Sequence, residues 1–179
     1  MRLIFFLLQL LSCSVVVGQQ TIRVGAKHFN EGYILSEMIA QILEAGGYPV
    51  ERKFNLGGTM VSFEALRTGA IDVYPEYTGT IAAEILKSQE PIAWKELNDR
   101  VKQRFPLEIS SPYGFNNTYA LVMAAKVASQ LNLQKISDLQ GHPELKVGVS
   151  YEFLERNDGW KNLTRAYELP QKAIGLEHG

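Results

Sequence analysis

One segment of this chain combines an aromatic ring and a hydroxyl in a spacing suited to binding a zwitterion. Residues 71–74 are rich in β-branched and aromatic side chains, which predicts a short strand, and the proline after them ends it. Tyr77 and Thr80 follow in a turn before a helix predicted over residues 81–87. A tyrosine face attracts a cation, and a hydroxyl beside the N–H groups of a helix N-terminus attracts an anion. A packing aromatic followed by an N-cap threonine is the alternative interpretation.

Two features could instead serve a hydrolytic enzyme on the same scaffold. Ser150 follows a predicted strand, as a nucleophile would, but it lacks the Gly-x-Ser-x-Gly elbow and has no obviously placed histidine. Asp72 and Glu76 are a candidate carboxylate pair on a strand and its turn, without a partner motif. The sequence therefore favours a binding site over a catalytic one.

Composition argues against several other classes. The formal charge is −1 and no basic stripe is visible, so nucleic acid is not an expected partner. The turn at residues 57–59 lacks the full dinucleotide fingerprint and a P-loop lysine, which favours a plain tight turn over a phosphate cradle. We expect no disulfide, no metal site and no cofactor, because the chain has a single cysteine and its three histidines show no ligand spacing: His28, His142 and His178.

The first half of the chain alternates between strand and helix patterns. Strands are predicted over residues 21–25, 50–54 and 71–74, with helices over residues 31–45, 60–67 and 81–87. This order is typical of a parallel sheet covered by helices on both faces. The first helix carries an apolar stripe that we expect to face the core: Ile34, Leu35, Met38, Ile39, Ile42 and Leu43.

The second half offers fewer elements. A helix over residues 91–105 and an extended segment lead to a predicted strand over residues 118–124, whose continuous apolar run suggests burial on both faces. Few elements remain to cover that strand, and we expect a C-terminally incomplete α/β protein. The later predictions are short helices over residues 127–132, 136–139, 152–156 and 160–167, and strands over residues 145–149 and 173–176.

The N-terminus predicts export from the cytoplasm. Residues 1–18 carry an arginine at position 2, continue through an apolar run and end in small residues, which is typical of a secretory signal peptide. This favours a periplasmic protein. The alternative is a lipoprotein signal ending before Cys13, which would anchor the chain to a membrane.

Several stretches together resemble one family, the substrate-binding component of ABC importers for glycine betaine, choline, carnitine and proline betaine. They occur in the family's order: residues 24–31, 56–59, 63–66, 71–80, 114–121 and 151–159. The resemblance implies a type II periplasmic-binding-protein-like fold with two α/β lobes, lobe I over residues 19–113 and a partial lobe II over residues 114–179. It also implies a non-catalytic protein that binds a quaternary ammonium osmoprotectant between the lobes and delivers it to permease and ATPase subunits.

The resemblance assigns one end of the ligand to basic and hydroxyl side chains. Lys27, Thr80 and Arg156 match residues that contact the ligand's carboxylate, with Arg156 coming from the second lobe. Lysine and arginine are effective donors to a carboxylate, which gives these assignments a physical basis.

The other end of the ligand is assigned to aromatic side chains. Tyr77 and Tyr119 match walls around the quaternary ammonium, and Asn117 matches a polar or backbone contact near the cation. A trimethylammonium group donates no hydrogen bond, so π faces and close packing must recognise it. The family builds its cage from further tyrosines that lie beyond residue 179. We therefore expect a truncated chain that binds weakly, and a non-functional remnant of such a protein is the alternative.

Overall fold

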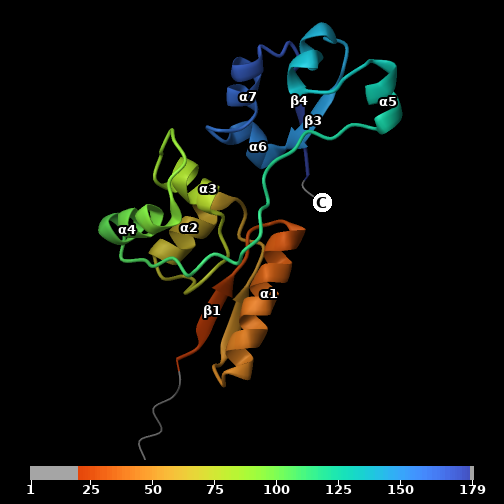
Figure 1. The fold of residues 1–179 in the computed structure, drawn as a ribbon. Coiled ribbons are helices and arrows are strands. Elements are labelled where there is room, and N and C mark those ends of the chain that lie inside the picture. Colours follow the sequence, from red (N-terminus) through yellow and green to blue (C-terminus); the bar gives the residue numbers. More distant parts are fainter. Residues whose placement is uncertain (1–19, 178–179) are drawn as a thin grey trace, which may run out of the picture.

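The computed structural model describes residues 20–177, whose elements gather in two α/β groups (Figure 1). The first group contains β1 (Ile22–Gly25), α1 (Asn30–Ala45), β2 (Val50–Lys53), α2 (Thr59–Arg67), α3 (Thr78–Thr80), η1 (Ile81–Ile85) and α4 (Trp94–Arg104). The second contains α5 (Ala125–Gln130), η2 (Ile136–Gly141), β3 (Val147–Ser150), α6 (Tyr151–Glu155), α7 (Trp160–Tyr167) and β4 (Ala173–Leu176). We call the two groups lobe I and lobe II; the boundary at residue 113 stays a prediction.

The N-terminal predictions fall outside this range. The signal peptide over residues 1–18 and Cys13 both lie outside the described residues. Among residues 20–177, no helix is long and apolar enough to cross a membrane.

The sheet of lobe I is smaller than the sequence predicts. β1 and β2 pair in parallel, but the predicted strand over residues 71–74 contributes only one bridge, between Val73 and Val24. The N–H groups of the two residues before Asp72 donate instead to the carbonyl of Ala65 in α2. Pro75 follows and has no N–H to extend the pairing. The predicted third strand is therefore wrong in extent, although its chain does run beside β1.

Helix α1 lies against the sheet with its small residues, not with the apolar stripe expected to do so. The buried positions are Gly32, Ser36 and Ala40, and the Ser36 hydroxyl donates to the carbonyl of Gly25 at 2.7 Å. Small side chains let the helix backbone approach the strand closely. Half of the predicted core stripe is consequently exposed: Ile34, Met38 and Ile42 are 62%, 55% and 69% exposed.

The helix predicted over residues 81–87 begins earlier than expected and is wider than an α-helix. Residues Thr78–Thr80 form one α-helical turn, so the turn predicted through Thr80 is wrong, and Ile81–Ile85 continue as a π-helical segment. Such segments are rare and are frequently found at functional sites. Tyr77 is the residue immediately before this helix.

The main core of lobe I lies between α2, η1 and α4. Its buried members are Phe63, Ile81, Ala82, Ile85, Leu97 and Val101. Leu97 is fully buried, and α4 brings it to this core together with Val101 one turn later. These helices support the segment that carries Tyr77 and Thr80.

Lobe II is built on a second two-stranded parallel sheet. β3 and β4 pair along all four of their residues, which confirms the strands predicted near residues 145–149 and over residues 173–176. A small core of Phe153, Trp160 and Leu169 lies between this sheet, α6 and α7. The short helices were also predicted, each within two residues of its observed ends.

The strand predicted over residues 118–124 is wrong. These residues form neither strand nor helix, and their side chains are exposed, with Val122 at 92%. Within the described residues no strand pairs with this segment, so its N–H groups make no ladder bonds. It runs instead as the chain that leads from lobe I to α5 (Figure 1).

Removing the side chain of Leu97 should destabilise lobe I. We expect Leu97→Ala to lower the free energy of unfolding by about 2–5 kcal/mol, because it leaves a cavity in a closed core. Val61→Ala in α2 is the matched control, since Val61 is 57% exposed, and it should change stability by less than about 0.5 kcal/mol. Urea unfolding followed by circular dichroism measures both. Equal shifts in the two variants would contradict this placement of the core.

Candidate functional site

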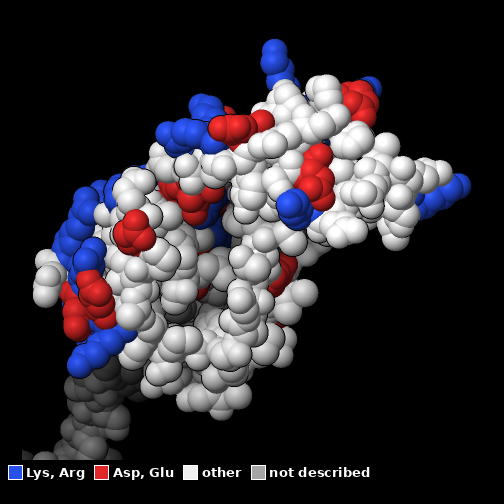
Figure 2. Space-filling model, turned by 45° about the horizontal axis from the view of Figure 1, so that its top comes forward, with Lys and Arg blue, Asp and Glu red and all other residues white. Residues whose placement is uncertain are grey.

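A pocket of about 920 Å³ lies between the two lobes and receives side chains from both. Figure 2 shows this face hollowed between the lobes, with a basic side chain visible inside the hollow and acidic side chains near its rim. All six site residues predicted from the sequence line this one pocket: Lys27, Tyr77, Thr80, Asn117, Tyr119 and Arg156.

Tyr77 is held at its hydroxyl end by a carboxylate. Its phenol donates to Glu31 Oε1 at 2.6 Å, and Asn117 Nδ2 donates both to Glu31 Oε2 at 2.9 Å and to the Tyr77 oxygen at 3.2 Å. Burial and the hydrogen bond to Glu31 raise the pKa of Tyr77. The ring is thus a neutral phenol, fixed in orientation. Asn117 contacts it from the segment that leads to lobe II.

Lys27 and Glu76 form a buried ion pair in the wall of the pocket. The Lys27 ammonium lies 2.7 Å from Glu76 Oε1, and the two side chains are only 5% and 6% exposed. The same carboxylate oxygen accepts from the N–H of Tyr77 at 2.9 Å. The ammonium also lies 5.3 Å from the centre of the Tyr77 ring and 5.4 Å from that of Phe29. One face of Tyr77 therefore already contacts a cation.

Arg156 connects the two lobes at the opposite wall. Its guanidinium makes a two-pronged ion pair with Asp158, at 2.8 and 2.7 Å, and donates to the Thr80 hydroxyl at 3.2 Å. Burial by itself lowers the pKa of Arg156, but the hydrogen bond to Asp158 and the neighbouring charges raise it above its usual value. The Arg156 side chain is only 6% exposed, so it is a rigid charged group.

Tyr119 stands beside this guanidinium with one side open. Its ring centre is 4.6 Å from that of Phe153 and 5.7 Å from the Arg156 guanidinium carbon, while the residue is 56% exposed. Burial against lobe II is the main cause of its raised pKa. Tyr119 thus presents a neutral aromatic surface to the pocket.

Further contacts join the lobes around the pocket. Thr59 donates to Glu152 at 2.7 Å, and the N–H of Asn157 donates to Glu84 at 3.1 Å. These carboxylates, like Glu31 and Asp158, were not predicted as site residues. Glu31 and Asp158 lie within the stretches that carry the family resemblance, which is the only sequence feature that could have pointed to them.

Over residues 20–176 the chain matches the family described as the substrate binding domain of ABC-type glycine betaine transport systems. The chain belongs to this family. The resemblance noted in the sequence is confirmed.

Three curated members of the family are about one-third identical to the chain. They are the ergothioneine transport permease/ergothioneine binding protein EgtU of Helicobacter pylori strain G27, the glycine betaine-binding protein YehZ of Escherichia coli K12 and the carnitine transport binding protein OpuCC of Listeria monocytogenes strain 10403S. Identities are 33%, 32% and 33%, and the matches cover 88%, 82% and 88% of the chain. The chain spans 29%, 51% and 54% of these relatives' own lengths.

Solved structures of substrate-binding proteins share the fold. Apo YehZ from Escherichia coli aligns with a TM-score of 0.54 and 29% identity. A glycine betaine/carnitine/choline ABC transporter aligns with a TM-score of 0.59 and 22% identity. Each match covers 89% of this chain and 61% of the solved chain. The predicted periplasmic-binding-protein-like α/β fold is therefore confirmed.

The residues that suggested an enzyme have structural roles in this member of the family. The Ser150 hydroxyl accepts from the N–H of Phe153 and caps α6. Asp72 pairs with Arg23 at 2.8 Å, while Glu76 pairs with Lys27, so each carboxylate is engaged by a different basic side chain. Among residues 20–177, no cluster of metal-ligating side chains is present. The relatives are binding and transport proteins.

Removing one partner of the buried ion pair between Lys27 and Glu76 should strongly destabilise lobe I. We expect Glu76→Gln to cost about 3–5 kcal/mol in the free energy of unfolding, because it leaves a buried ammonium without its counter-charge. The double variant Lys27→Met/Glu76→Gln should recover much of this loss.

The control for this experiment is an exposed pair. Glu64 and Arg67 are 47% and 48% exposed, so Glu64→Gln should cost no more than about 1 kcal/mol. Chemical unfolding of all four proteins tests the prediction. A loss in Glu76→Gln as small as that in Glu64→Gln would contradict it.

Proposed function

We propose that the chain binds a quaternary ammonium compatible solute, such as glycine betaine or choline, between its two lobes. In this proposal it is the extracytoplasmic solute-binding component of an ABC importer and delivers the solute to permease and ATPase subunits. The observation that carries the proposal is the single pocket lined by Tyr77 and Thr80 from lobe I and by Tyr119 and Arg156 from lobe II.

The cationic end of such a solute requires aromatic faces. Tyr77 and Tyr119 present neutral phenols to the pocket, and Asn117 donates hydrogen bonds to both Tyr77 and Glu31. Because the Lys27 ammonium covers one face of Tyr77, the quaternary group has the other face and the open side of Tyr119. Glu152, which lines the pocket, and Glu31, which accepts from the Tyr77 hydroxyl, add a favourable potential for a cation.

The anionic end requires donors of positive charge. Arg156 and Thr80 already touch each other at 3.2 Å, so a carboxylate placed against both would bridge lobe II to lobe I. A lysine ammonium has three N–H donors, and Glu76 accepts from one of those of Lys27. Lys27 can therefore donate a further hydrogen bond to a ligand. A ligand that bridges the lobes favours their closed arrangement, which is how such proteins signal occupancy.

The predicted signal peptide is part of this proposal. Export through residues 1–18 would place the protein in the periplasm, where an importer captures solute, and lipidation at Cys13 would place it on the membrane instead. Mass spectrometry of the mature N-terminus distinguishes the two.

Removing the charge of Arg156 should discriminate between solutes with and without a carboxylate. We expect glycine betaine, carnitine and choline to bind the purified full chain in calorimetric titrations. Arg156→Met should weaken the binding of glycine betaine and carnitine by about 10- to 150-fold, the value of a charged hydrogen bond. It should weaken the binding of choline by less than about 3-fold.

The control is Arg52→Met, whose side chain pairs with Glu37 and Glu44 on lobe I and does not line the pocket. It should leave all three affinities unchanged. No heat with any of the three solutes, or an equal loss of choline and glycine betaine in Arg156→Met, would overturn the proposal.

Replacing the aromatic wall should affect all three solutes alike, because each carries the quaternary group. We expect Tyr77→Leu to weaken binding by about 2- to 30-fold, the range of one cation–π contact. Tyr48→Leu is the matched control, since Tyr48 is 44% exposed and lies outside the pocket. Unchanged affinities in Tyr77→Leu would exclude Tyr77 from the cage.

A further inference from the structure

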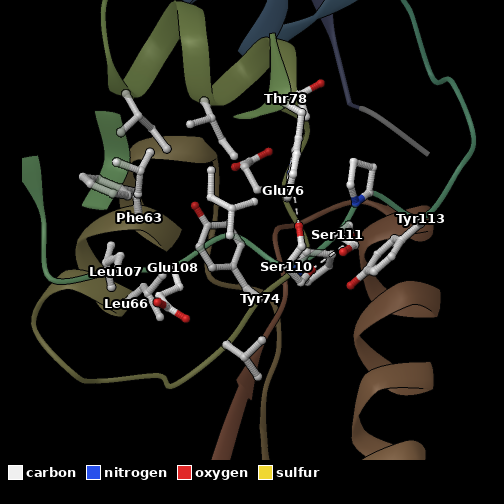
Figure 3. Close-up of a pocket in the computed structure, with 18 of the residues that line it drawn as sticks. Phe63, Leu66, Tyr74, Glu76, Thr78, Leu107, Glu108, Ser110, Ser111 and Tyr113 are labelled. Carbon is white, nitrogen blue, oxygen red and sulfur yellow. Dashed lines mark hydrogen bonds between the residues drawn. The ribbon is translucent and has the colours of Figure 1, made fainter. Parts of the chain in front are cut away.

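A second cavity, of about 230 Å³, lies within lobe I and is separate from the proposed solute site (Figure 3). It is partly open to solvent and is lined by α2, η1, α4, residues 72–78 and the extended segment 107–113. Its apolar walls include Phe63, Leu66, Ile81, Ile85, Leu107 and Ile109. An apolar cavity of about 150 Å³ is enough to hold benzene, so this one accommodates a small molecule with a ring or a short alkyl chain.

Glu76 stands between the two cavities and lines both of them. Its Oε1 atom is engaged by Lys27 and by the N–H of Tyr77, but its Oε2 atom is buried and has no hydrogen-bond partner. The side chain is 94% buried, from an exposed fraction of 6%. A buried carboxylate oxygen without a donor is costly, and such atoms in native structures call for an explanation.

The side chains around this oxygen favour a donor that carries positive charge. Figure 3 shows Glu76 and Tyr74 side by side among the apolar side chains of the cavity. Burial raises the pKa of Tyr74, and the charge of Glu76 and the approach of the two side chains toward a hydrogen bond raise it further, so Tyr74 remains a neutral phenol. The Tyr74 hydroxyl still makes no hydrogen bond with Glu76 Oε2, which leaves that acceptor available to a charged donor. Of the residues that the structure describes, three acids line the cavity, Asp72, Glu76 and Glu108, and no lysine, arginine or histidine does.

Aromatic rings add to the same preference. Phe63, Tyr74, Trp94 and Tyr113 line the cavity, and π faces attract cations. Asp72 and Glu108 have partners of their own in Arg23 and Lys102, which leaves Glu76 as the acid with an open acceptor. The complementary ligand is therefore cationic, has an N–H to donate and carries an apolar body.

We propose that this cavity is a second binding site, for a small primary ammonium compound with an aryl or alkyl body, whose N–H donates to Glu76 Oε2. The requirement for a donor separates this site from the proposed solute site, since a quaternary ammonium group has no N–H. The inference does not depend on which solute, if any, occupies the pocket between the lobes.

Phenethylammonium is a suitable probe because its nine heavy atoms end in a primary ammonium. We expect saturable binding to the full chain, seen as shifts of the methyl resonances of Ile81, Ile85 and Ile109, which line this cavity and not the other. The N,N,N-trimethyl derivative of the same amine, which has no donor, should shift these methyls at least 10-fold less strongly at equal concentration.

Two variants test the location of the site. Leu66→Trp fills the cavity from α2 and should abolish the shifts, whereas Met60→Trp places the same ring on the exposed side of α2 and should leave them unchanged. Glu76→Gln should weaken binding at least 10-fold if the variant remains folded, and Leu66→Trp keeps the test decisive if it does not. Undiminished shifts in Leu66→Trp, equal shifts with the trimethyl derivative, or no shifts at millimolar amine would each overturn the proposal.

Discussion

The ion pair between Lys27 and Glu76 is the interaction on which the geometry of the pocket depends. It joins the residue that follows β1 to the segment that carries Tyr77, and the same carboxylate holds the Tyr77 N–H. Burying two charges is costly unless each is paired and hydrogen-bonded, and here the pair sits against the rings of Tyr77 and Phe29. The wall is therefore neutral overall, which suits a ligand whose own charges cancel.

The opposite wall of the pocket also pairs a buried cationic side chain with a carboxylate. Asp158 neutralises Arg156, and Thr80 and Tyr119 surround the guanidinium. Each charged side chain deep in the pocket thus has a partner before any solute arrives. Neutralised charges of this kind lower the free-energy cost of desolvation when a zwitterion binds. Recognition then depends on shape and on aromatic surface as much as on charge.

The sequence predicted the types of most elements and proposed six site residues that line one pocket, but it failed where neighbours decide the outcome. Tyr77, Thr80 and Arg156 could be proposed because they lie in short motifs. The apolar pattern of α1 could not say which side meets the sheet, because Ser36 and Ala40 permit a closer approach than Ile34 or Met38. The apolar run over residues 118–124 predicts a strand only if another strand lies beside it. The unsatisfied oxygen of Glu76 depends on packing from four separate segments and has no sequence pattern.

Within the described residues, a single passage of chain leads from lobe I to lobe II (Figure 1). Polar contacts also join the lobes across the pocket, chiefly Arg156 to Thr80, Thr59 to Glu152 and Asn157 to Glu84. Any change in the angle between the lobes must therefore first break these few contacts.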